Sequence, residues 1–216
     1  MDITVLKDDV QVYIAGHETN KEVLLELCDE FAGLEAKCTL AARTDLPDDI
    51  YFTCAKALYE LHNKDIDHEI VYNSVMEDID LLSLYAQSDF EDIRRGVAYH
   101  ADVLPVEVQE KLSKDEDDVV YTLAQCSKNA DILVDIIKYA DIESATEALT
   151  NHYIPIEKLN VFRERIHDFD INDTYYIKNA VDRFSRNPAE KERAEALNNI
   201  HDILVEQIKE MEMEER

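Results

Sequence analysis

"IRRGVAYHADVLPVEVQEKLSKD", residues 93–115, is followed by "VVYTLAQCSKNADILVDIIKYAD", residues 119–141, and the two stretches share one pattern of apolar positions. A third stretch, "ATEALTNHYIPIEKLNVF", starts at Ala145, so the pattern repeats every 26 residues. Each repeat carries two apolar stripes, which indicates two short helices of roughly ten residues. One such pair cannot bury both stripes, whereas stacked pairs can. The sequence therefore predicts an α-solenoid.

The same period extends toward the N-terminus. An aliphatic residue followed by a mostly small one recurs at steps of 26, 31, 26, 26 and 26 residues. The pairs are Ile14-Ala15, Leu40-Ala41, Val71-Tyr72, Val97-Ala98, Leu123-Ala124 and Leu149-Thr150. The longer step predicts a longer helix from Ile50 to about His62. We expect an all-α fold with five to six two-helix repeats of about 26 residues in residues 1–165, and a C-terminal helical pair in residues 166–216 that caps the array.

One repeat carries a family resemblance. "SDFEDIRRGVAYHADVLPVEVQEKLSKD", residues 88–115, resembles the leucine-rich repeat variant family, a relative of HEAT-like α-solenoids, at Ile93, Arg94, Val97, Ala98, Pro105, Val108 and Leu112. The resemblance covers roughly residues 5–165 and implies a right-handed superhelix, but says little about function. The Asn usual after the small residue is replaced, by His100 and His152 for example. The cysteine cluster of the family's iron–sulfur members has no counterpart, so no cluster is implied.

The charge sets the class of partner. The chain has 49 Asp and Glu against 22 Lys and Arg, a net charge of −27. Such a surface repels DNA, RNA and anionic membranes and attracts basic proteins. The plain alternative is that the charge only keeps the protein in solution. The four cysteines form no C-x-x-C pair, and no apolar run reaches transmembrane length, so we expect a cytoplasmic protein.

Acidic residues recur at the predicted starts of helices. They are spaced by 26 residues as Asp89, Asp115 and Asp141, and as Glu91, Asp117 and Glu143. An Asp at an N-cap accepts a backbone N–H, and acids in a first turn favour the helix dipole, so capping is the simplest reading. Four consecutive acids exceed what one cap needs, and the surplus suggests a partner-binding acidic ridge. This acidic ridge comprises Asp89, Glu91, Asp92, Asp115, Glu116, Asp117, Asp118, Asp141 and Glu143.

Chemical sites find little support in the sequence. His17, His100 and His152 share one repeat position, but equivalent positions in stacked repeats lie about 9–10 Å apart, too far for shared metal bonds of about 2 Å. Only three glycines are present, and no glycine-rich phosphate loop or nucleophile motif occurs. We therefore expect no metal, no cofactor and no enzymatic activity.

The C-terminal segment offers a second surface for association. Asn187 and Pro188 mark the start of a long helix whose apolar stripe is Ala194, Leu197, Ile200 or His201, Leu204, Ile208 and Met211. This helix either seals the last repeat or forms a homodimer or partner contact. For the whole chain, we predict a non-enzymatic protein-binding scaffold. The alternative is a nucleic-acid mimic that inhibits a DNA- or RNA-binding protein, as some phage counter-defence proteins do.

Overall fold

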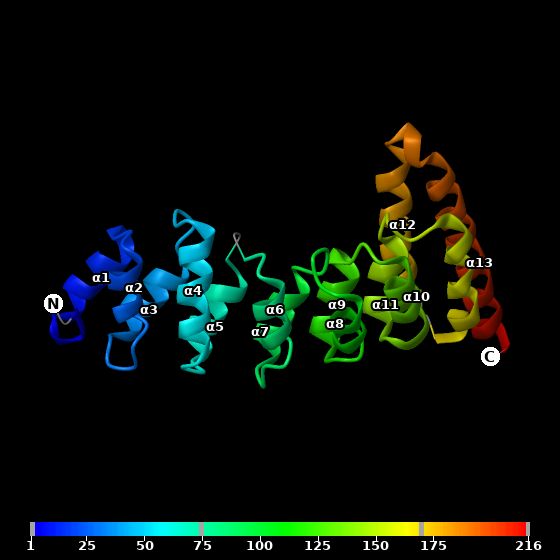
Figure 1. Ribbon diagram of the computed structural model, residues 1–216. Helices are drawn as coiled ribbons and strands as arrows, with labels where there is room; N and C mark the ends of the chain where they lie inside the picture. The colour runs from blue at the N-terminus through cyan, green and yellow to red at the C-terminus, as the bar shows by residue number, and fades with distance from the viewer. Residues whose placement is uncertain (1–2, 74–75, 169–170, 215–216) are drawn as a thin grey trace. The chain divides into compact units, whose positions relative to one another are not determined.

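A computed structural model describes residues 3–73, 76–168 and 171–214 (Figure 1). All regular secondary structure in these residues is helical, which confirms the predicted all-α class. The chain forms two compact units, residues 1–104 and 105–216, and each is described by itself. This division falls inside the predicted repeat array. The expected boundary near residue 165 lies within one 3₁₀ helix and stays a prediction.

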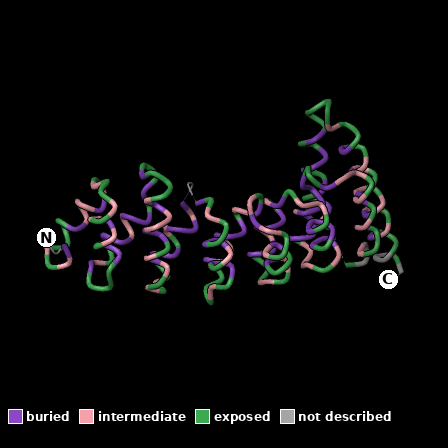
Figure 2. Tube along the Cα trace, viewed as in Figure 1, coloured by how far each residue is buried: buried purple, intermediate pink, exposed green. Residues whose placement is uncertain are grey.

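Unit 1 consists of short helices that alternate between two sets. Helices α1, α3, α5 and α7 each pack against the next member of this set, and the intervening helices lie beside them. In Figure 2 the buried residues lie where neighbouring helices face one another. The elements are η1 (Ile3–Val5), α1 (Asp8–His17), α2 (Lys21–Glu26), α3 (Leu34–Ala41), α4 (Asp48–Tyr59), α5 (Lys64–Val71), α6 (Ile79–Tyr85) and α7 (Glu91–Ala98).

Unit 2 begins with the same alternation and ends in longer helices. Helix α9 packs against α11, while α13 packs against α12 and η2. The stripe predicted on the last helix is buried at Ala194, Leu197, Ile200, Leu204 and Ile208, whereas the side chain of Met211 is outside those described. The elements are α8 (Val106–Leu112), α9 (Asp117–Cys126), α10 (Ala130–Tyr139), α11 (Ile142–Thr150), η2 (Ile156–Asp168), α12 (Asp173–Ser185), η3 (Pro188–Glu190) and α13 (Lys191–Glu214).

Many of the predicted apolar positions are buried. Ala36, Ile93, Val119 and Ala145, which occupy one repeat position, are all buried. Val10, at the same position of the first repeat, is 40% exposed, so its predicted burial is wrong. Burial of one Val or Ile side chain stabilises a fold by about 1.5–3 kcal/mol. The longer helix expected near residues 50–62 is α4, the longest of unit 1.

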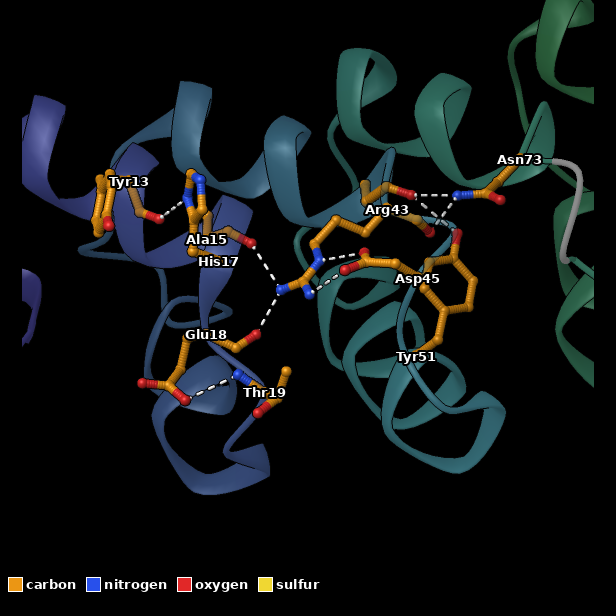
Figure 3. Close-up of polar contacts among 10 residues, drawn as sticks. Tyr13, Ala15, His17, Glu18, Thr19, Arg43, Asp45, Tyr51 and Asn73 are labelled. Carbon is orange, nitrogen blue, oxygen red and sulfur yellow. Dashed lines mark hydrogen bonds and ion pairs between the residues drawn. The ribbon is translucent and has the colours of Figure 1, made fainter.

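In unit 1, polar side chains that follow one helix bond to the C-terminal carbonyls of an earlier helix. Arg43 donates from Nη1 to the carbonyl of Ala15 at 3.1 Å and is held by a two-pronged ion pair with Asp45, with both distances 2.8 Å (Figure 3). Asn73 in turn donates to the carbonyls of Ala41 and Arg43 at 2.8 and 3.0 Å. Because these carbonyls lie at or just beyond a helix C-terminus, they lack intrahelical partners.

Unit 2 contains the same kind of side-chain hydrogen bond to carbonyls at a helix C-terminus. Asn151 donates to the carbonyls of Ala124 and Ser127 at 2.8 and 3.1 Å, at the end of α9. Arg193, from α13, donates to the carbonyls of Asn151 and Ile154. The last helix is thus tied by buried hydrogen bonds to the loop that follows α11.

Candidate functional site

The acidic ridge residues of unit 1 lie at the start of α7. Glu91 and Asp92 occupy its first turn, and the side chains of Asp89 and Glu91 are exposed. Asp92 is half-buried and pairs with Lys64, whose Nζ lies 3.2 Å from Asp92 Oδ2. Phe90 takes the N-cap position, so the predicted capping role of Asp89 is wrong. Two exposed carboxylates remain for contact with a partner.

The run of four acids in unit 2 surrounds the start of α9. Asp115 Oδ1 accepts the N–H of Glu116 at 2.8 Å, but Asp115 precedes the N-cap and does not cap the helix. Glu116 takes the N-cap position without a side-chain capping bond. Asp117 and Asp118 form the first turn, where they favour the helix dipole. Glu116, Asp117 and Asp118 are all exposed.

The start of α11 fits the capping prediction. Asp141 Oδ1 accepts the N–H groups of Glu143 and Ser144 at 2.8 and 3.0 Å. The difference arises because α11 begins directly after Asp141, whereas α7 and α9 begin two residues after Asp89 and Asp115. Glu143 is exposed in the first turn of α11.

The unit 2 part of the acidic ridge is a continuous feature of two neighbouring helices. Helices α9 and α11 pack together, and Ser144 Oγ lies 3.5 Å from the carbonyl oxygen of Asp117, to which it donates. The structure therefore brings Asp115–Asp118 beside Asp141 and Glu143. The three residues near α7 belong to unit 1 and form a separate group.

Both units are acidic, so the charge is spread along the chain. Residues 1–104 contain 23 acidic against 8 basic residues, and residues 105–216 contain 26 against 14. At physiological ionic strength such a surface attracts opposite charges mainly within about 8 Å.

A cavity adjoins the unit 2 part of the acidic ridge and was not predicted from the sequence. It measures about 210 Å³ and is lined by residues of α9, α11 and α12, among them Tyr121, Glu143, Thr146, Glu147, Tyr176 and Arg183. Tyr121 donates from its hydroxyl to Glu147 Oε2 at 3.4 Å. Burial, followed by the charge of Glu147, raises the pKa of Tyr121. A second cavity of about 410 Å³ shares Glu147 and Arg183 with the first. Glu143 belongs to both the ridge and the first cavity.

Two of the three histidines at the shared sequence position contact backbone carbonyls. His17 Nδ1 lies 2.9 Å from the carbonyl oxygen of Tyr13, and His100 Nε2 lies 2.7 Å from that of Val71. Within the described residues, no group of three or more His, Cys, Asp or Glu side chains is placed to hold a metal ion. The described helices include none with the length and apolar character that a membrane span needs.

Comparison with known proteins identifies no relative: no protein family, curated protein or solved structure matches the chain.

Proposed function

We propose that this protein is a non-enzymatic interaction protein that binds a basic surface of another protein through its acidic ridge. The observation that carries this proposal is the set of exposed carboxylates in unit 2. Glu116, Asp117, Asp118 and Glu143 are exposed and lie at the starts of two packed helices. Charged side chains arranged this way raise association rates with oppositely charged partners.

The architecture that we propose for this function is a solenoid of five to six two-helix repeats, with α12 and α13 as its cap. It is supported by the successive packing of α1, α3, α5 and α7, and by side chains that bond to the preceding repeat. Deleting residues 119–144, one full period, should leave a cooperatively folded helical protein, because repeats contact mainly their neighbours. Deleting 119–138, which breaks the period, should not. Equal folding of both deletions would contradict the repeat architecture.

The binding proposal is tested by parallel capture from a lysate of the native host. The bait proteins are the wild type, a Glu116→Gln/Asp117→Asn variant and a Glu206→Gln/Glu210→Gln variant. The last pair removes the same charge from exposed positions of α13 and serves as the matched control. We expect one basic protein to be enriched on the wild type and the control but depleted on the ridge variant. Equal recovery on all three baits would exclude the ridge as the interface.

The nucleic-acid mimic is a second candidate, and the acidic balance of both units favours it. A mimic must occupy the site where its partner holds DNA or RNA. Once a partner is captured, adding this protein should displace a labelled oligonucleotide from it in proportion to occupancy. If the partner binds this protein and the oligonucleotide at the same time, this protein acts as a scaffold and not as a mimic.

A reducing compartment such as the cytoplasm fits the thiols of this chain. Cys28 and Cys54 are buried and free, with Cys28 Sγ lying 3.8 Å from the carbonyl oxygen of Cys54. Disulfides persist mainly in oxidising compartments.

A further inference from the structure

We infer that the 210 Å³ cavity of unit 2 receives one arginine side chain of the partner protein. This inference rests on the proposed function, because it names the residue of the partner that the acidic surface would recognise. The cavity volume is below the roughly 300–1,000 Å³ of typical small-molecule sites, which favours a single side chain over a cofactor.

The walls of the cavity match a planar cation. Glu143 and Glu147, one turn apart on α11, supply two carboxylates. Tyr121 on α9 and Tyr176 on α12 supply aromatic rings, and Tyr176 is 51% exposed. A guanidinium can bond to carboxylates with its fork of N–H groups while its plane lies on a tyrosine ring, which a lysine ammonium does less well.

A buried hydroxyl in the cavity wall lacks a partner. Thr146 lines the cavity and is 3% exposed, and among the described residues its Oγ1 has no hydrogen-bond partner. Buried polar groups normally have one, so an unpaired hydroxyl needs a separate explanation. A guanidinium N–H in the cavity would satisfy it once the Thr146 side chain rotates, because Oγ1 is closed to solvent in the structure. This observation is independent of the acidic residues.

Among the described residues that line the cavity, Arg183 is the one basic residue, and it indicates the form of the ligand. Its Nη2 donates to the carbonyl of Thr150 at 2.9 Å, and its guanidinium carbon lies 4.8 Å from the centre of the Phe184 ring. The carboxylates of Glu143 and Glu147 outnumber this guanidinium, so the cavity wall keeps a net negative charge. Arg183 is exposed, so it can also donate to a main-chain carbonyl of a bound segment. The ligand is therefore a peptide segment, with its arginine side chain in the cavity and its backbone at Arg183.

The test is a titration of the full chain with a short acetylated and amidated peptide, Gly-Gly-Arg-Gly-Gly, followed by amide chemical shifts. Peptides with citrulline or lysine in place of arginine are the comparisons. We expect arginine to shift signals of α11 and α12, lysine to bind more weakly, and uncharged citrulline not to bind. Glu147→Gln should raise Kd about tenfold. Its control is Glu206→Gln, which removes the same charge from α13 and should change Kd less than about twofold.

The variant Thr146→Val distinguishes an effect on peptide binding from an effect on the stability of the fold. Removing an unpaired buried hydroxyl should leave the melting temperature unchanged or raise it. If the hydroxyl accepts a hydrogen bond from arginine, the same variant should bind the peptide several-fold more weakly. Diffuse shifts over all acidic positions, or equal effects of Glu147→Gln and Glu206→Gln, would overturn the cavity assignment. The cavity assignment alone fails if Glu116→Gln/Asp117→Asn weakens binding of the captured partner but Glu147→Gln and Thr146→Val do not. The ridge assignment alone fails if only the cavity variants weaken binding of the captured partner.

Discussion

Asp67 provides the sharpest test of the core of unit 1. This residue of α5 is 5% exposed, and its Oδ1 accepts a hydrogen bond from the Tyr85 hydroxyl at 3.3 Å. Burial raises the pKa of Asp67 to about 6, against smaller opposing effects of the bond from Tyr85 and the charge of His62. The ionised carboxylate is therefore unfavourable in the folded protein at neutral pH.

The expected change in the free energy of unfolding follows from the difference between the pKa of Asp67 in the folded and in the unfolded protein. The pKa is 3.8 without the fold and about 6 within it, and each pH unit of difference is worth about 1.4 kcal/mol. Because the folded state binds the proton more tightly, its contribution to stability is complete below pH 3.8 and is lost as pH rises through 6. Above that range the loss has an upper bound of about 3 kcal/mol. Asp67→Asn keeps an acceptor for Tyr85 and removes the charge.

Urea unfolding followed by circular dichroism, from about pH 4 to pH 8, measures this difference. We expect Asp67→Asn to be more stable than the wild type by about 1–3 kcal/mol near pH 8 and to lose this advantage toward pH 4. Asp65→Asn, an exposed change on the same helix, is the control and should differ by less than about 0.5 kcal/mol throughout. An advantage of Asp67→Asn that does not change with pH, or its absence at every pH, would refute the reasoning.

Two further predictions use matched pairs of residues. A Cβ at Gly96 would lie 2.5 Å from Cγ2 of Val71, so Gly96→Ala should lower the free energy of unfolding by about 1–3 kcal/mol, whereas Gly16→Ala should be neutral or stabilise by up to about 1 kcal/mol. Equal effects in chemical denaturation would contradict the tight packing of α7 on α5. Asp141→Ala should cost about 1 kcal/mol through the lost cap, and Asp89→Ala less than about 0.5 kcal/mol. Equal melting temperatures of these two variants would show that the Asp141 cap does not matter.

Periodicity predicted the helices well because burial follows it. Ile93, Val119 and Ala145 are buried as their 26-residue spacing requires. Whether an acid caps a helix depends on the residue at which the helix begins, which the 26-residue period does not fix. Helix α11 begins one residue earlier in the period than α9 does, so Asp141 is an N-cap residue whereas the equivalent Asp115 precedes the N-cap. The nine ridge residues were therefore placed correctly at helix starts, but only Asp141 proved to be a cap.

The polar bonds to earlier helices were indicated only in part. Arg43 and His100 stand where the family usually has Asn, and they contact the carbonyls of Ala15 and Val71. The family resemblance directed attention to the second residue after the small one, where His152 stands instead of Asn. The adjacent Asn151 supplies the bonds to the preceding repeat, one position earlier. Arg193, which donates to the carbonyl of Asn151, comes from α13, and Tyr176 of the cavity comes from α12. Both helices lie outside the 26-residue period. Contacts between the repeats and the last helices depend on tertiary packing and leave no periodic signal.

The most direct test of the central claim is the association kinetics of the captured partner at several salt concentrations. We expect the association rate to fall steeply with salt, and Glu116→Gln/Asp117→Asn to lower that rate and flatten its salt dependence with little change in dissociation. The control Glu206→Gln/Glu210→Gln should change the salt dependence much less. An affinity that responds neither to salt nor to the substitutions at Glu116 and Asp117 would contradict binding through the acidic ridge.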